Sequence, residues 1–134
     1  MGKFTDIQDR LIKTYRIQLC NGTLCKNDWS RTHVHIQKRR ICKWVQKNSL
    51  KSTFTLLHEI GHIEAHTGSM RRAESEYHAT VWAMEKASQL GLDIPDSLIQ
   101  FYQDYIDRTK NRGIRRGGGD YNDLSLPEYP IRGV

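Results

Sequence analysis

The residues with the clearest chemical potential lie in one short stretch, His58-Glu59-Ile60-Gly61-His62, which has the pattern H-E-x-x-H. Four residues make about one helical turn, so on a helix both imidazoles project from one side and can bind a single metal ion. The glutamate beside the first histidine then lies close enough to hold a water molecule that the metal activates. The stretch therefore predicts a hydrolytic zinc site that lacks only its third protein ligand.

His66 follows the motif by four residues and is the first candidate for that ligand. On one continuous helix it would lie two turns from His58, about 12 Å along the axis, which is too far to share the metal ion. Sites that use a distant third histidine break the helix with a glycine first, and here Gly68 follows His66 instead. The other common solution takes a carboxylate from the next helix.

The next predicted helix, over about residues 70–90, carries four candidate ligands: Glu74, Glu76, His78 and Glu85. On a helical wheel, small and apolar residues all fall within about 60° of Glu76, namely Ala79, Thr80, Ala83, Ala87 and Leu90. A lone carboxylate is costly to bury in such a stripe unless it binds a cation. Glu76 is therefore the preferred third ligand, with a salt bridge to an arginine as its alternative role. His78 and Glu74 remain the other candidates.

Hydrophobic periodicity predicts the elements that position these residues. A 3.6-residue spacing predicts helices over residues 4–15, 50–67, 70–90 and about 95–111. The alternating apolar residues within residues 16–46 predict two to four short strands of a small, mostly antiparallel sheet, with a tight turn at Asn21-Gly22. We therefore expect an α+β fold in which this sheet packs on a bundle of about four helices.

Gly61 lies in the interior of the motif helix, where it costs about 1 kcal/mol relative to alanine. We expect a close neighbour that needs the space of the missing side chain.

Length and composition suit one compact soluble domain. The chain has 134 residues, of which 37% are hydrophobic and 27% charged. We expect residues 1–112 to form this single domain and residues 113–134, rich in glycine and proline, to be a flexible tail unless the domain's own groove or a partner orders it. No apolar run approaches the length of a bilayer span, and the first residues have no signal-peptide core. We therefore expect a cytoplasmic protein without membrane contact.

Three cysteines are present: Cys20, Cys25 and Cys42. A zinc knuckle usually needs a second close pair of ligands, and none follows the first two. We expect reduced thiols on or near strands.

The net charge is +6, and the basic residues form two clusters. These are Lys38, Arg39, Arg40, Lys43, Lys47 and Lys51, and then Arg108, Lys110, Arg112, Arg115 and Arg116. They could bind nucleic acid or an acidic patch on a protein partner. Because no helix-turn-helix, RNP or zinc-finger pattern is present, a solvated surface is favoured over a nucleic-acid interface.

Residues 50–90 resemble the ImmA/IrrE-type zinc metallopeptidases, small bacterial and phage-encoded proteins. The resemblance rests on residues 54–62, FTLLHEIGH, followed by His66. It also rests on Glu74-Ser75-Glu76 leading into residues 79–83, ATVWA. The family commonly places its ligand glutamate directly before an alanine, whereas His78 precedes Ala79 here.

The resemblance implies a zincin-like fold, a phage or mobile-element origin, and zinc-dependent cleavage of a protein partner such as a transcriptional repressor. Zinc would be held by His58, His62 and Glu76, with Glu59 as the general base. The candidates for stabilising the oxyanion are Tyr77, His66, His33 and His35. An edge strand within residues 30–46 could bind the substrate as an added strand, with the basic run at residues 38–40 selecting an acidic target.

Two other functions stay open. The first is a zinc-containing binding protein without catalysis, which would regulate or inhibit a host or phage factor by occupying it. The second, less favoured, is a basic nucleic-acid-binding module whose affinity falls steeply with salt.

Overall fold

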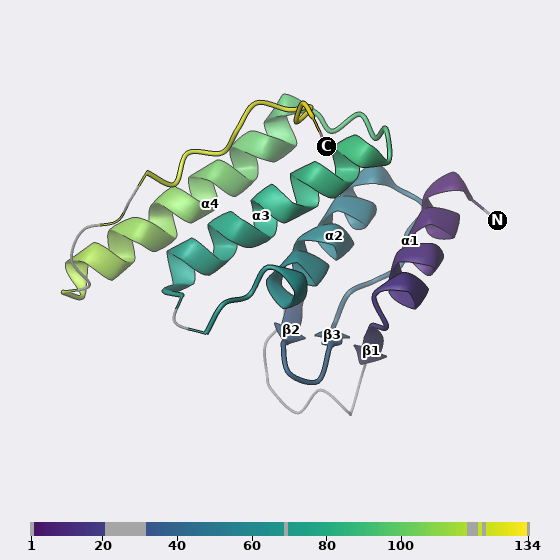
Figure 1. The fold of residues 1–134 in the computed structure, drawn as a ribbon, viewed down its shortest axis with the longest axis horizontal. Coiled ribbons are helices and arrows are strands. Elements are labelled where there is room, and N and C mark those ends of the chain that lie inside the picture. The colour runs from purple at the N-terminus through teal and green to yellow at the C-terminus, as the bar shows by residue number, and fades with distance from the viewer. Residues whose placement is uncertain (1, 21–31, 69, 118–120, 122, 134) are drawn as a thin grey trace.

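The computed structural model describes residues 2–20, 32–68, 70–117, 121 and 123–133 (Figure 1). In chain order these ranges form α1 (Lys3–Thr14), β1 (Gln18–Cys20), β2 (His33–His35), β3 (Arg40–Cys42), α2 (Leu50–Glu64), α3 (Arg72–Gln89) and α4 (Asp96–Arg115). The helices are accompanied by a small sheet, so the predicted α+β class is confirmed. In the described ranges, no helix combines the length and the apolar character needed to cross a bilayer.

The sheet has the strand order β1-β3-β2 and is mixed. β1 pairs with β3 in parallel, whereas β2 and β3 are antiparallel. The mostly antiparallel sheet that we predicted is therefore only half right, because an alternating pattern indicates which face is buried but not which direction the neighbouring strand runs. β2 and β3 form a hairpin whose connection contains Arg39 at φ 51°. The turn predicted at Asn21-Gly22 lies outside the described residues.

Local sequence signals account for the ends of the helices that carry the candidate site. α2 begins after Ser49, whose hydroxyl oxygen accepts a hydrogen bond from the Ser52 N–H at 3.1 Å. It ends at Glu64, one turn before the predicted stop at residues 67–68. α3 is followed by Gly91 at φ +69°, a left-handed conformation that favours glycine.

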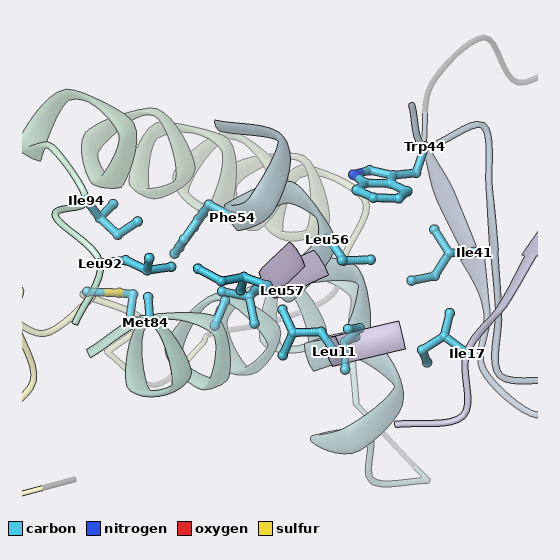
Figure 2. Packing of buried hydrophobic residues seen from close by; sticks show 14 of the residues in the cluster. Leu11, Ile17, Ile41, Trp44, Phe54, Leu56, Leu57, Met84, Leu92 and Ile94 are labelled. Carbon is cyan, nitrogen blue, oxygen red and sulfur yellow. The ribbon is translucent and has the colours of Figure 1, made fainter. Parts of the chain in front are cut away.

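α2 lies at the centre of the molecule, between α1 and α3 (Figure 1). Its Phe54, Leu56, Leu57 and Ile60 are fully buried. Figure 2 shows the core continuing from these residues in two directions. Toward the sheet it includes Leu11, Ile17, Ile41 and Trp44, and toward the α3–α4 connection it includes Met84, Leu92 and Ile94. The motif helix is thus held from both sides, which gives its donor side chains a rigid support.

Gly61 is the point of closest approach between α2 and α3. A Cβ atom built at Gly61 would lie 2.4 Å from the carbonyl oxygen of Ala79 and 3.0 Å from its Cα atom. The predicted close neighbour is therefore the backbone of α3, and it lies one turn after Glu76.

We expect Gly61→Ala to destabilise the protein. Alanine gains about 1 kcal/mol of helix propensity, but the clash with backbone atoms forces the helices apart, and overpacking of this kind costs about 1–3 kcal/mol or more. Urea unfolding monitored by circular dichroism measures the difference. Gly68→Ala is the control, because nothing lies within 4 Å of a Cβ at Gly68. A Gly61→Ala protein as stable as the wild type would contradict the close packing.

Residues 123–133, drawn in yellow, run back along α4 (Figure 1). Leu124 is buried, and Leu126, Tyr129 and Ile131 pack against the core. The Tyr129 hydroxyl donates to the Leu92 carbonyl, and the Ile131 N–H donates to the Ser88 hydroxyl at 2.9 Å. In the structure, residues 123–133 therefore lie on the surface of the domain itself.

Candidate metal centre

Three donor side chains from two helices meet at one point. His58 and His62 lie one turn apart on α2, and Glu76 reaches them from α3. Oε2 of Glu76 is 3.1 Å from Nε2 of His58 and 3.2 Å from Nε2 of His62. All three residues are buried, and their donor atoms lie within 4.8 Å of one another. The group could hold a metal ion.

The spacing of these atoms fits such an ion. Tetrahedral zinc with ligands at about 2.0–2.1 Å keeps its donor atoms about 3.3 Å apart, close to the two distances from Glu76. Nε2 of His58 is buried and makes no hydrogen bond of acceptable geometry within the described part of the chain, although the Glu76 oxygen is near. In its neutral form with the proton on Nδ1, the His58 ring could therefore bind an ion shared with Glu76.

The other ring nitrogens of the two histidines face partners of their own. Nδ1 of His62 lies 3.1 Å from the Ser75 hydroxyl, and Nδ1 of His58 lies 3.7 Å from Oε1 of Glu59. With the proton placed on Nδ1, the Nε2 atom of each ring keeps a lone pair that can bind a metal ion shared with Glu76. Partners of this kind orient the histidines of metal sites.

The electrostatics of the group favour a positive charge between the helices. Burial opposes ionisation of His58, but the carboxylates of Glu59 and Glu76 outweigh it and raise the His58 pKa well above its ordinary value. Burial also opposes ionisation of Glu76, yet the close contact of its carboxylate with the two imidazoles holds its pKa far below the usual range. Two buried carboxylates beside two imidazoles attract a cation, which can be a proton or a metal ion.

The structure separates the three candidates for the third ligand. Glu76 lies at the α2–α3 contact, as the helical wheel predicts, among buried residues of α3: Ala73, Ala79, Thr80, Ala83, Met84 and Ala87. His78 is exposed, and Glu74 pairs with Arg71 at 2.7 Å. Leu90 departs from the predicted stripe and is 42% exposed, because α3 ends at Gln89. Only Glu76 of these candidates joins the histidines.

A cavity of about 510 Å³ opens beside the donor atoms. It is lined by Thr32, His33 and Val34 at β2, by His58, Glu59 and His62 on α2, by Met70, Arg72, Ser75 and Glu76 at α3, and by Phe101, Tyr102 and Tyr105 on α4. Glu59 is therefore buried at the wall of the same cavity as the three donors, as the motif predicts.

The predicted oxyanion-stabilising residues are not gathered there. Tyr77 packs beside Ala73 and Ile106, away from the cavity. His66 lies beyond the end of α2 and is exposed, and it lines a second hollow together with His35. His33 alone of the four residues reaches the cavity.

Sequence reasoning missed the side chains that α3 and α4 bring to this cavity. The Tyr102 ring lies 4.8 Å from the His58 ring, and burial raises the pKa of its phenol, so the hydroxyl keeps its proton. The Tyr105 hydroxyl accepts a hydrogen bond from Arg72 at 3.2 Å. The signal that could have found the tyrosines is their i, i+3 spacing on one face of the aromatic helix.

A comparison of the chain with protein-family models, curated proteins and solved structures finds no match.

Proposed function

We propose that this protein is a zinc-dependent peptidase of the ImmA/IrrE type that cleaves a protein partner. One observation carries the proposal: His58, His62 and Glu76 converge within 4.8 Å at the wall of a cavity that also holds Glu59. Two histidines and a glutamate are the ligand set of one major class of zinc hydrolases, which leave the fourth position for water or substrate. The distances from Glu76 to both imidazoles support zinc as the ion.

Zinc bound there would act as a Lewis acid, lowering the pKa of water toward neutrality and polarising a scissile carbonyl. Glu59 would take the proton from the attacking water and deliver it to the leaving amine. Ser75 would hold the His62 ring in place through Nδ1. Tyr102, kept in its protonated form, and Arg72 line the cavity and would be the candidates for stabilising the developing oxyanion.

β2 supports an extended peptide as the substrate. It is an edge strand of the described sheet, and Thr32, His33 and Val34 line the cavity. A peptide adding to this edge would pass beside the donor atoms, with its backbone hydrogen bonds met by the strand. In the basic run next to it, Arg39 is held by the Tyr15 carbonyl and the Glu64 carboxylate. Lys38 and Arg40 are therefore the better candidates for selecting an acidic target.

A repressor from the same phage or mobile element is the partner to test first, as the resemblance of residues 50–90 implies. We expect the purified, zinc-loaded protein to cut such a repressor at a defined bond. Chelation should stop cleavage and added zinc should restore it, with the bond identified by mass spectrometry. Tight binding of a repressor that stays intact at full zinc loading would contradict the peptidase function and support the zinc-containing binding protein instead. Salt-sensitive DNA binding that chelation leaves unchanged would support the nucleic-acid alternative instead.

A further inference from the structure

We propose a second metal site, on the small sheet, in which His33 and His35 of β2 and Cys42 of β3 bind a zinc-type divalent ion. The donor atoms of these three residues lie within 4.8 Å of one another. His33 and Cys42 are buried and His35 is half-buried. The proposal goes beyond the peptidase function and does not depend on it, because none of the three residues belongs to the donor group on α2 and α3.

The pairing of the strands creates this cluster. His33 is the register partner of Cys42 in the antiparallel β2–β3 pair, so their side chains lie on the same face of the sheet. His35 follows two residues later on β2 and returns to that face. The two imidazole rings meet edge to face, with centroids 5.5 Å apart and planes at 76°. Residues that the sequence separates by up to nine positions thus point into one small volume.

The chemistry of the donors selects the ion. A thiolate with two imidazoles suits zinc and its neighbours in the first transition row, whereas calcium and magnesium prefer oxygen ligands. A buried thiol alone is an ordinary small apolar group. Two imidazoles beside it, one of them buried, make a costly environment unless their nitrogens are bonded, and a metal ion bonds all three donors at once.

Cys20 lies on the neighbouring strand β1, although it is not one of the three residues whose donor atoms lie within 4.8 Å of one another. It is the register partner of Cys42 in the parallel β1–β3 pair, so its side chain faces the same side, and it is buried. Cys20 and Cys42 both carry thiols. Two thiolates and two imidazoles are the closed ligand set of structural zinc sites, which have no open position for water. With Cys20 drawn in as the fourth ligand when the ion binds, the sheet site would be structural.

The size of the sheet gives such a site a clear role. Within the described residues, each of its three strands has only three residues, below the usual length of about five or six. An ion held by β2 and β3 would link these two strands and fix their register, and a thiolate from Cys20 would add β1. Because His33 and Val34 also line the cavity beside Glu76, it would also hold one wall of the first site in place.

Cobalt(II) distinguishes the two sites, because only the sheet site contains sulfur. We expect the full-length protein, stripped of metal and titrated with cobalt, to bind about two ions per chain and to show a thiolate-to-cobalt charge-transfer band. Cys42→Ser should lose the band and one ion. His58→Ala should keep the band and lose the other ion, and His66→Ala, which changes a histidine outside both groups, should behave as the wild type.

A wild-type protein that binds one ion without a charge-transfer band would overturn the sheet site, and so would a band of wild-type intensity in Cys42→Ser. If Cys42→Ser fails to fold, the His58→Ala protein tests the sheet site, because we expect it to keep only the sheet ion. A mercurial thiol reagent should then release that zinc. Release of one zinc per chain supports the site, and absence of bound zinc rejects it. The two proposals can fail separately. A charge-transfer band in the His58→Ala protein would support the sheet site even if the wild-type protein cleaves no partner and the peptidase proposal fails.

Discussion

Replacing Glu59 by glutamine is expected to abolish cleavage while the protein keeps its metal. The amide has the size of the carboxylate but cannot accept a proton from the attacking water. General-base assistance contributes about 10²–10⁴-fold in rate, so we expect the cleavage rate to fall by at least that factor. Glu59 is not one of the three converging donors, and its Oε1 atom lies 3.7 Å from Nδ1 of His58, not beside the Nε2 atom that faces Glu76. Metal binding should therefore survive the change.

The experiment compares the cleavage rate and the metal content of the same preparations. The metal content is measured by elemental mass spectrometry after acid digestion of the protein. Glu64→Gln is the matched control, since it makes the same change on the same helix outside the cavity. Glu64 pairs with Arg39 at the surface, where an ion pair contributes little stability. Wild-type cleavage by Glu59→Gln would remove Glu59 from the mechanism. Loss of metal in this variant would instead assign Glu59 to the ion.

The donors on α2 and the candidate Glu76 could be found from the sequence because helical geometry is local. The spacing of His58 and His62 determines that they share a face, whatever surrounds the helix. Glu76 emerged because a carboxylate within a small-residue stripe is costly to bury, and the same stripe lets the helices approach at Gly61. Packing and donor placement are thus two consequences of one pattern.

The rest of the site depends on contacts between distant segments, which local periodicity does not report. Tyr102 reaches His58 only because α4 packs against the α2–α3 pair, and Arg72 meets Tyr105 across two helices. The sheet cluster shows this most clearly. The sequence after Cys20 contains no second close pair of ligands. The ligands of the sheet cluster come together only because strand pairing places Cys42 beside His33. The parallel pairing of β1 with β3 was equally invisible in the alternating pattern.

The two candidate sites also meet at β2. His33 belongs to the cluster on the sheet and lines the cavity beside Glu76. If both proposals hold, loss of the sheet ion loosens the strand that receives the peptide. Cleavage would then weaken through substrate binding, and KM would rise more than kcat would fall. A defect in the helix site would have the opposite pattern, because its donors act on the reacting bond.

The identity of the third ligand predicts the other large effect. Glu76→Gln is expected to lose the ion of the helix site, so that metal content falls by one ion relative to the wild type. A neutral amide replaces a carboxylate whose pKa the two histidines hold far below its usual range. Loss of a partner that only orients a ligand costs about 10–100-fold in metal affinity, and loss of a ligand should cost more.

His78→Ala is the matched test, because His78 occupies the position before Ala79 where the family commonly has its ligand, yet its side chain is exposed. We expect this variant to keep the metal content and the cleavage rate of the wild type.

Full metal content in Glu76→Gln with loss in His78→Ala would move the third ligand to His78. That result would require α3 to rotate by about 160° about its axis between the metal-free and the metal-bound protein, because His78 is two residues from Glu76 and residues on a helix are about 100° apart. The contact of Gly61 with the Ala79 backbone leaves no room for such a rotation without separating the helices. The close packing at Gly61 and the choice of Glu76 therefore support each other, and the metal content of these two variants tests both.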